Sequence, residues 1–533
     1  MGVIGDLLRR TSKVYPDKVA VIDKLGKYTP FDTRYNWREF NAKVNRLANS
    51  LLKMNLQSQD RVAIYSDTRS QFFITYMALA KAGLVTVPIN TAYKGDELAY
   101  LISNSGARAV IADVDRLPAL RAILPNLTDV QYVIGLGKGH YVDHDCQFDF
   151  NTLMSEGSEK EPAVVVDEQD LAMLLYTSGT TGRPKGAMLT HRNWYTSAQI
   201  VTGEWRLYSN SKFLCMLAPF FTGCFVFMTF AAAKGFTIVM SDFEPRKALD
   251  IITKEKIDYT MFVPTMTSRI VKFPEIQKYD LSNLKQVITS GAPISEALVR
   301  EASDVLFKGE LRFIFTYGTS ETAIGGCILQ PEEVSLQGPG SERLTSVGKS
   351  MLGMQVKVLD EDGTEVEPGS DITGEIVVIG DTVGKGYWGM PENQELKDGV
   401  WYSGDLAKVD KDGYIYIVDR KKDMILSGGA NIYPREIEDV IFGHPAVMHT
   451  AVVGIPDQEW GEKVHAIVVP RDGVKVSAQD IIKFCKEHLA SYKCPKSVEF
   501  VDFQDLPVNP AGKILKRKLK ENYWKNRQRK GEV

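Results

Sequence analysis

The stretch from Tyr176 to Gly186, YTSGTTGRPKG, concentrates the residue types that bind phosphate. Its glycines let backbone N–H groups come close to a polyphosphate, and its threonine and serine hydroxyls add further donors. Arg183 and Lys185 supply positive charge. It is not a Walker loop, because Lys185 is followed by Gly186 and not by serine or threonine. A surface loop rich in glycine and threonine is the alternative, but the length of the pattern favours a polyphosphate-binding loop.

The segments around this loop alternate between strands and helices. The N-terminal half contains apolar strands and helical stretches in the order Val62–Ser66, Gln71–Ala82, Leu84–Ile89, Asp96–Ser103 and Ala109–Asp113. This βαβαβ order predicts a parallel sheet with helices on its faces, and a similar alternation returns from Met173 to Thr289. The loop follows an apolar strand at Leu171–Leu175 and precedes a helical region that begins near His191.

The sequence pattern changes after Gly348, from alternating strands and helices to short strands. Short strands (QVKVLD, GEIVVIG, YIYIVD) are separated by Asp/Gly turns, which predicts a small antiparallel β region. A compact α+β segment follows, with a helix at Ala478–His488, and we place a domain boundary at Arg420–Asp423. The basic tail from Lys516 to Lys530 is expected to be helical at its start.

The segment Phe213–Ala233 has no charge and is about as long as a membrane span. Pro219 and Gly223 interrupt it near its middle. We therefore interpret it as a buried strand, a turn and a buried helix that line a site, and not as a transmembrane helix.

Composition excludes several functional classes. The formal net charge of −3 over 533 residues, with no basic arm before the fold, gives no indication of nucleic-acid binding. Six cysteines are scattered without a CxxC pair, and the seven histidines lack metal spacing such as HExxH, so neither a disulfide framework nor a zinc site is expected. The N-terminus lacks the apolar core of a secretory signal, and together these features predict a cytoplasmic protein.

Six further motifs follow the loop in order. They are Ser290–Pro293 (SGAP), Thr316–Thr322 (TYGTSET), Trp401–Leu406 (WYSGDL), Asp419–Met424 (DRKKDM), Ser427–Ile432 (SGGANI) and Pro507–Lys513 (PVNPAGK). Together with the loop they closely resemble the motifs of the AMP-forming, acyl-activating superfamily, which includes acyl-CoA synthetases, peptide-synthetase adenylation domains and firefly luciferase. The resemblance runs from about residue 10 to residue 522.

The resemblance implies an α/β fold with two domains. Residues 1–420 would form a large N-terminal domain that binds ATP and the acid, built of two βαβ-type sheets and a small distorted β-barrel. Residues 421–533 would form a small, mobile α+β lid that swings about a hinge near Lys422. In this family a carboxylate attacks the α-phosphate of ATP, which converts a poor acyl donor into a mixed anhydride with AMP as the leaving group. The anionic reactants repel one another, so the site must supply cations.

The resemblance also assigns roles to residues. Lys513, Glu321 and Thr177 would be catalytic: Lys513 would bridge the acid carboxylate and the α-phosphate, and Glu321 would hold Mg²⁺. Asp405 would bind the ribose hydroxyls, and Arg420 the ribose or phosphate. The implied ATP and AMP contacts are Thr177, Ser178, Gly179, Thr180, Thr181, Gly182, Lys185, Gly291, Ala292, Pro293, Thr316, Tyr317, Gly318, Thr319, Ser320, Asp405, Arg420 and Lys513. Coenzyme A would meet Ser427, Gly428, Gly429 and Lys493, although a solvated basic face remains an equal alternative for Lys493 and its neighbour Lys496.

The expected acid pocket departs from the common family pattern. It comprises Phe220, Phe221, Thr222, Gly223 and Gly318. Many relatives place a histidine, which gates the pocket, where Thr222 stands, and Ser320 replaces the threonine of the family's YGxTE motif. Acetate-activating relatives carry tryptophan at the position of Gly318. Glycine there predicts room for a longer or cyclic acid, and a Gly318→Trp substitution would be expected to shift preference toward acetate.

We therefore expect an ATP- and Mg²⁺-dependent carboxylic acid–CoA ligase for a medium- or long-chain fatty acid, or for an aromatic or alicyclic acid. The resemblance also disfavours an amino acid, because peptide-synthetase adenylation domains place an aspartate in this region to pair with the amino group, and none lies between Lys212 and Met240. The main alternative is an adenylating enzyme that loads a carrier protein. A luciferase-like oxidase is disfavoured by the altered pocket motif. A non-catalytic lipid-binding protein is also disfavoured, because it would have no need of Lys513, Asp405 and Glu321. The basic tail leaves peripheral membrane contact open.

Overall fold

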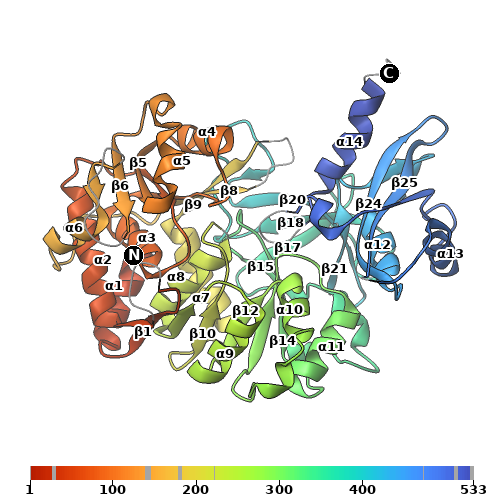
Figure 1. Cartoon of the computed structure of the whole chain (residues 1–533), viewed down its shortest axis with the longest axis horizontal. Helices are drawn as coiled ribbons and strands as arrows, with labels where there is room; N and C mark the ends of the chain where they lie inside the picture. The colour runs from red at the N-terminus through yellow and green to blue at the C-terminus, as the bar shows by residue number, and fades with distance from the viewer. Residues whose placement is uncertain are drawn as a thin grey trace. The chain divides into compact units, whose positions relative to one another are not determined.

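The computed structural model describes residues 2–26, 32–137, 146–177, 183–220, 222–471, 473–508 and 514–528. The chain divides into two compact units: residues 1–356 with 377–402, and residues 357–376 with 403–533. Figure 1 shows both units, coloured along the chain. The lid boundary at residue 420 and the hinge at Lys422 remain predictions.

The first unit contains a seven-stranded sheet. Its strands, in spatial order, are β7 (Phe148–Asp149), β6 (Tyr132–Leu136), β5 (Ala107–Asp113), β3 (Arg61–Tyr65), β4 (Val85–Pro88), β8 (Leu171–Thr177) and β9 (Lys185–Thr190). All neighbours are parallel except β8 and β9, which pair antiparallel. The helices between successive parallel strands are α3 (Ser70–Ala82), α4 (Gly95–Ser105) and α5 (Leu117–Arg121). This is the βαβαβ unit that the sequence predicts, with each element within two or three residues of its expected ends.

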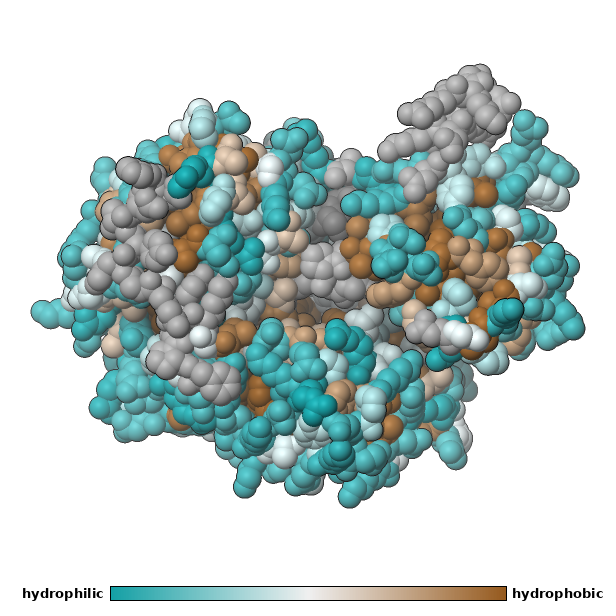
Figure 2. Space-filling model, viewed as in Figure 1, coloured by the Kyte–Doolittle hydropathy of each residue, from teal (hydrophilic) through white to brown (hydrophobic). Residues whose placement is uncertain are grey.

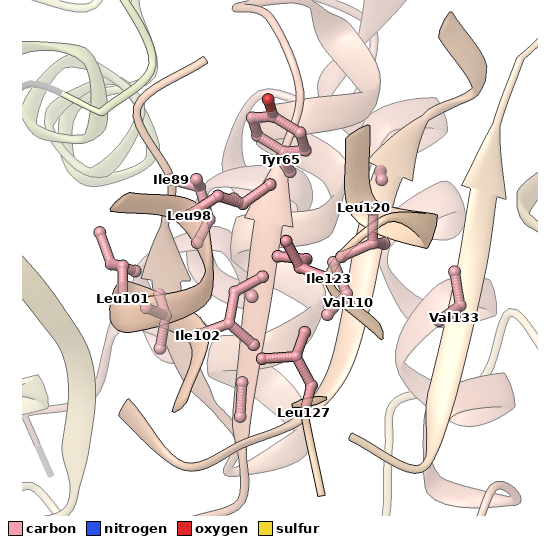
Figure 3. Packing of buried hydrophobic residues seen from close by; sticks show 14 of the residues in the cluster. Tyr65, Ile89, Leu98, Leu101, Ile102, Val110, Leu120, Ile123, Leu127 and Val133 are labelled. Carbon is pink, nitrogen blue, oxygen red and sulfur yellow. The ribbon is translucent and has the colours of Figure 1, made fainter. Parts of the chain in front are cut away.

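One face of this sheet is covered by a close-packed apolar layer. Leu98 and Ile102 are four residues apart on α4, so they lie on the same side of the helix. Figure 3 shows both side chains over the sheet, in one buried cluster with Val110 of β5 and Tyr65 of β3. Leu174 of β8 belongs to the same buried cluster, so the strand that precedes the phosphate loop is packed into this layer.

A nine-stranded sheet makes up the rest of the first unit. In spatial order it contains β16 (Lys349–Ser350), β15 (Gly326–Leu329), β14 (Phe313–Gly318), β13 (Gln286–Thr289), β12 (Tyr259–Phe262), β10 (Lys212–Cys215), β11 (Thr237–Met240), β1 (Val19–Asp23) and β2 (Thr33–Asn36). The six strands from β14 to β1 are parallel. The residues that follow β10, β13 and β14 therefore leave from the same edge, where ligands of open α/β sheets commonly bind.

Helices surround this second sheet. They are α1 (Ile4–Val14), α2 (Trp37–Leu52), α7 (His191–Glu204), α8 (Thr222–Lys234), α9 (Pro245–Glu255), α10 (Pro264–Val271) and α11 (Glu296–Phe307). Helix α6 (Phe150–Glu156) packs instead against α2 and against β6 and β7 of the seven-stranded sheet. Figure 1 shows α9, α10 and α11 in front of the strands of this sheet. The apolar segment Phe213–Ala233 folds as the predicted strand and helix, β10 and α8. Within the described ranges, each helix is too short or too polar to cross a bilayer.

A five-stranded sheet occupies the region predicted to be antiparallel. Its strands are β17 (Gln355–Leu359), β18 (Gly374–Ile379), β20 (Val400–Val409), β19 (Leu396–Lys397) and β21 (Ile415–Arg420), which pairs with β20. The pairs β19–β20 and β20–β21 are antiparallel. The register sets Asp405 directly opposite Arg420. Closure of this region into a small barrel remains a prediction.

The second unit contains a sheet covered on both faces. Its strands are β23 (Ala430–Ile432), β22 (Ile425–Ser427), β25 (Gly461–Pro470), β24 (Val447–Asp457) and β26 (Ser497–Phe500), and its helices are α12 (Pro434–Phe442), α13 (Ala478–His488) and α14 (Lys516–Gln528). Alternate residues of β25 enter different cores: Val464 and Val468 pack with Ile437 of α12, whereas Ile467 packs with Leu519 of α14. The space-filling view shows brown patches among the hydrophilic surface of this unit (Figure 2).

Candidate active site

A buried carboxylate lies at the centre of the candidate site in the first unit. Glu321 follows β14 and is 7% exposed. The hydroxyl of Thr177, the last residue of β8, donates to its Oε1 at 3.0 Å, and the phenol of Tyr387 donates to the same oxygen at 3.1 Å. Burial, together with the charge of Glu321, raises the pKa of Tyr387, so the phenol remains a neutral donor. The structure thus brings together Thr177 and Glu321, which lie 144 residues apart in the sequence.

Tyr387 was not predicted from the sequence. It lies on a segment that runs along β9: the amide of Lys385 donates to Met188 O at 2.9 Å, and that of Trp388 donates to Gly186 O at 2.8 Å. The amide of Gly384 donates to Glu321 O at 2.8 Å. The segment reads GKGYWG, and its only sequence signal is that its glycines flank an aromatic pair. Nothing in that pattern shows that a phenol meets Glu321.

The oxygen atoms at this site suit Mg²⁺. A carboxylate and a hydroxyl are hard ligands, and Mg²⁺ usually takes one or two carboxylates together with substrate phosphates. Within the described ranges no group of three or more histidine, cysteine or acidic side chains could hold a metal by itself. A single carboxylate that shares the ion with ATP fits this arrangement.

The phosphate-loop lysine lies on a strand and not at a helix N-terminus. Lys185 begins β9, is 6% exposed, and places its Nζ 2.8 Å from Glu395 Oε2 and 5.1 Å from the centre of the Tyr387 ring. The strand β9 between the loop and α7 was not foreseen, although α7 begins at the predicted His191. The predicted contacts Ser178, Gly179, Thr180, Thr181 and Gly182 lie outside the described residues.

The other predicted nucleotide contacts of this unit lie at the carboxyl edge of the nine-stranded sheet. Gly291, Ala292 and Pro293 are exposed after β13, and Gly291 has a φ of 83°. Thr316 and Tyr317 lie within β14, where the Thr316 hydroxyl donates to Cys327 O at 3.2 Å. The hydroxyls of Thr319 and of Thr289, which ends β13, are buried without a hydrogen-bond partner in the described part of the chain. Thr289 is therefore a further candidate contact, because a buried hydroxyl normally has a partner.

The expected acid pocket is described only in part. Thr222 is the first residue of α8, and its Oγ1 lies 2.6 Å from the Ser320 hydroxyl. Phe220 is half-buried, Gly223 lies in α8, and Phe221 falls outside the described residues. At Gly318 the backbone itself requires glycine: a Cβ there would lie 2.1 Å from the carbonyl oxygen of Ile324.

In the second unit, Asp405 and Arg420 form an ion pair. Arg420 Nε lies 3.0 Å from Asp405 Oδ1, and Asp405 is 5% exposed. The preceding Asp419 accepts hydrogen bonds from the amides of Arg420 and Arg435, at 2.7 and 2.8 Å. The sequence placed Asp419 in the hinge motif but did not predict that it holds the first turn of α12. Lys422 is exposed in the turn that follows.

The predicted coenzyme A loop is a tight hairpin turn between β22 and β23. Gly428 and Gly429 have φ values of 57° and 83°, and a Cβ on Gly428 would lie 2.5 Å from the ring of Trp460. Ser427, at the end of β22, pairs with Gly461 of β25. Lys493 forms an ion pair with Glu436, in which its Nζ lies 2.7 Å from Oε2. Lys513 lies outside the described residues, and beside it Val508 pairs with Ile514 in an antiparallel bridge.

Comparison with known proteins now identifies the family. A family model described as AMP-binding enzyme matches residues 8–388, and one described as AMP-binding enzyme C-terminal domain matches residues 436–513. A feruloyl-CoA synthase from an Amycolatopsis species is 36% identical over 496 residues, which cover 92% of this chain and 94% of that protein. The long-chain-fatty-acid–CoA ligase FadD13 of Mycobacterium tuberculosis is 33% identical over 523 residues, 98% of each chain. The crystal structure of ATP-bound MatB from Rhodopseudomonas palustris matches with a TM-score of 0.85 at 31% identity, covering 97% of this chain and 99% of that one.

The chain therefore belongs to the AMP-binding enzyme family. Within that family it is an AMP-forming acid–CoA ligase, which uses ATP with Mg²⁺ to make an acyl-adenylate and then transfers the acyl group to coenzyme A. These findings confirm the family, the fold class, the reaction and the cosubstrates that the sequence motifs predict.

Proposed function

We propose that the acid has an uncharged tail: a medium- or long-chain fatty acid, or an aromatic or alicyclic acid. The supporting observation is that β10, α8 and the turn between them carry no charged residue from Phe213 to Ala233. A charged tail next to these elements would lose its hydration without gaining a partner. The hydroxyls of Thr222 and Ser320, 2.6 Å apart, lie at the start of α8, next to this uncharged segment.

In the first half-reaction, a carboxylate oxygen of the acid attacks the α-phosphorus of ATP, and the bond to pyrophosphate breaks. Glu321 is oriented for this step by Thr177 and Tyr387, which donate to the same oxygen, Oε1; among the described residues no hydrogen bond to the other oxygen is seen. Mg²⁺, when bound there, offsets phosphate charge. In the second half-reaction, the sulfur of coenzyme A attacks the carbonyl carbon, AMP leaves with the bonding electrons, and the thiol proton is released.

The remaining roles are proposed by family resemblance. Lys513 neutralises charge between the acid and the α-phosphate during adenylation, and Asp405 binds the ribose. Residues 421–533 swing about Lys422 between the half-reactions, after which Ser427, Gly428, Gly429 and Lys493 face coenzyme A. The Asp405–Arg420 ion pair supports a nucleotide role for Asp405, because it fixes the position of this carboxyl group beside a cation.

The test is a panel of acids assayed for pyrophosphate release and, with coenzyme A as sole acceptor, for acyl-CoA. Hexanoate, benzoate, ferulate and longer fatty acids should be used in preference to acetate. A preference for acetate, or for a dicarboxylic acid or an amino acid, would overturn the proposed substrate class. Pyrophosphate release without acyl-CoA would favour the alternative, in which the acyl group passes to a carrier protein.

We also propose that the enzyme works in the cytoplasm without binding strongly to membranes. The basic helix α14 has three cations paired with carboxylates: Lys516 with Glu438 at 2.9 Å, Arg517 with Glu521 at 2.7 Å, and Lys520 with Glu462 at 2.7 Å. Paired cations attract anionic lipid weakly. Sedimentation with phosphatidylserine vesicles at physiological salt should leave most of the protein in the supernatant, and strong co-sedimentation would contradict this proposal.

A further inference from the structure

We propose that Thr222 is a positioning residue: its hydroxyl donates to Ser320 and thereby directs the Ser320 proton toward a phosphoryl oxygen of the nucleotide. The inference rests on the proposed function, which places the acid and ATP at this edge of the sheet. The observation that carries it is the 2.6 Å separation between Thr222 Oγ1 and Ser320 Oγ, two residues 98 positions apart in the sequence.

The direction of this hydrogen bond follows from counting protons. Each hydroxyl has one proton to donate and two lone pairs that accept. A phosphoryl oxygen only accepts, so Ser320 must donate to it when the nucleotide is bound. The Ser320 proton is then used, and the contact with Thr222 survives only if Thr222 donates to Ser320. Hydrogen bonds arranged head to tail in this way strengthen one another.

Both partners are held by packed elements. Thr222 is 8% exposed at the start of α8, and this helix is fixed farther along by the Thr229–Tyr76 hydrogen bond at 2.9 Å. The stacked rings of Phe213 and Phe227, 3.9 Å apart, attach α8 to β10. These contacts anchor the helix that carries Thr222.

Ser320 lies in an equally constrained turn between β14 and β15. The amide of Ile324 donates to Thr319 O at 3.0 Å, and Ser197 of α7 donates to Ala323 O at 2.6 Å. Ala323 and Ile324 have φ values of 45° and 72°, which are uncommon for residues other than glycine. The next residue after Ser320 is Glu321, so the same turn carries both the hydroxyl and the carboxylate of the candidate site.

The hydrogen bond between Thr222 and Ser320 gives a role to Thr222, which stands where many relatives carry histidine. Where many relatives carry histidine, the shorter Thr222 extends a hydroxyl to Ser320 and connects the wall of the acid pocket to the phosphate site. The two departures from the family pattern, Thr222 and Ser320, are hydrogen-bond partners of one another.

The test is a double-mutant cycle on acid-dependent pyrophosphate release, with Thr222→Val, Thr222→Ser, Ser320→Ala and the Thr222→Val/Ser320→Ala double variant. Thr222→Val keeps the shape but loses the proton, so kcat should fall about tenfold, as expected for one lost hydrogen bond to a group that contacts a charge. Thr222→Ser should recover most of that loss. In the Ser320→Ala background, Thr222→Val should cost less than about twofold, because the partner is already missing.

The matched control is Thr229→Val. It removes another buried threonine hydroxyl from the same helix, one that bonds Tyr76 far from the motif. It should lower the midpoint of denaturant unfolding but leave kcat of the folded enzyme within about twofold. Unfolding curves of all variants show whether each one is folded.

Three results would overturn the proposal: a Thr222→Val kcat equal to wild type, a Thr222→Val loss that persists undiminished in the Ser320→Ala background, or no recovery with serine at 222. Failure of the proposed function would look different. In that case the wild-type enzyme itself would release no pyrophosphate with any uncharged-tail acid, whereas failure of the positioning role is read from ratios among active variants.

Discussion

A substitution at Gly318 tests whether glycine is required there by the backbone of the β14–β15 turn or by the size of the acid pocket. A Cβ at this position would lie 2.1 Å from Ile324 O, 2.5 Å from its carbonyl carbon and 2.8 Å from its Cα. An ordinary carbon–oxygen contact is about 3.3 Å, so the β14–β15 turn would have to move by about 1 Å. The atoms that the new Cβ would meet belong to the backbone of Ile324, and a backbone cannot relieve the clash by rotating a side chain.

We therefore expect Gly318→Ala to be harmful in two ways. Overpacking of this kind should reduce the free energy of unfolding by about 3 kcal/mol. A shift of about 1 Å in the turn also displaces Glu321, which should lower the rate of pyrophosphate release by about 10²-fold for every acid alike. The Gly318→Trp substitution suggested by the acetate-activating relatives should fail for the same reason, and not by filling the pocket.

The assay combines denaturant unfolding with the acid panel, and Gly203→Ala is the control. Gly203 lies in α7, and a Cβ there would meet nothing within 4 Å. Alanine there should be neutral or should stabilise the protein by up to about 1 kcal/mol through helix propensity. If Gly318→Ala unfolds at the wild-type midpoint, or if it mainly reorders the preference among acids, then steric conflict with the Ile324 backbone is not what requires glycine.

Three further expectations follow from single contacts. Glu395→Gln removes the partner of Lys185, which then binds phosphate without first breaking an ion pair, so the KM for ATP should fall about two- to fivefold; an unchanged or higher KM contradicts this. Burial lowers the pKa of His191 to about 4, below its unfolded value of about 6.5, so stability should be lost as pH falls from about 6.5 to about 4. That loss should amount to about 2 kcal/mol between about pH 7 and pH 5, and His191→Gln should flatten it in unfolding curves; an equal pH slope refutes the assignment. Lys513→Ala should slow pyrophosphate release by about 10²–10³-fold but still convert pre-formed acyl-adenylate and coenzyme A to thioester, whereas a parallel loss of both would argue for a single rigid site.

Periodicity and motif order predicted most of the fold. The βαβαβ region was recognisable because its strands are apolar runs and its helices are amphipathic or buried segments of the right length, as in α3 and β4. The division of Phe213–Ala233 into β10 and α8 followed from a proline and a glycine near its middle. Strand β9 was missed because it begins within the phosphate loop at Lys185 and carries few β-branched residues.

Contacts between distant segments could not be predicted in this way. Tyr387 reaches Glu321 because its segment runs along β9, and Glu395 reaches Lys185 from the same part of the chain. The restriction at Gly318 depends on the path of the Ile324 backbone, which no local pattern encodes. Motifs identify which residues take part in the chemistry, but the hydrogen bonds that orient them depend on the complete fold.

The burial of all six cysteines has a consequence for the enzyme's own survival. An acyl-adenylate is an acylating agent, and it would modify any thiolate that reached its carbonyl carbon. Burial raises the pKa of Cys327 and of Cys485 to about 12, which keeps these thiols protonated as well as inaccessible. We therefore expect coenzyme A to meet no competing protein thiol in the folded enzyme, and the acyl-adenylate to modify the protein's own cysteines slowly when coenzyme A is absent. A thiol-specific dye added to the native protein should accordingly report the consumption of coenzyme A with little background.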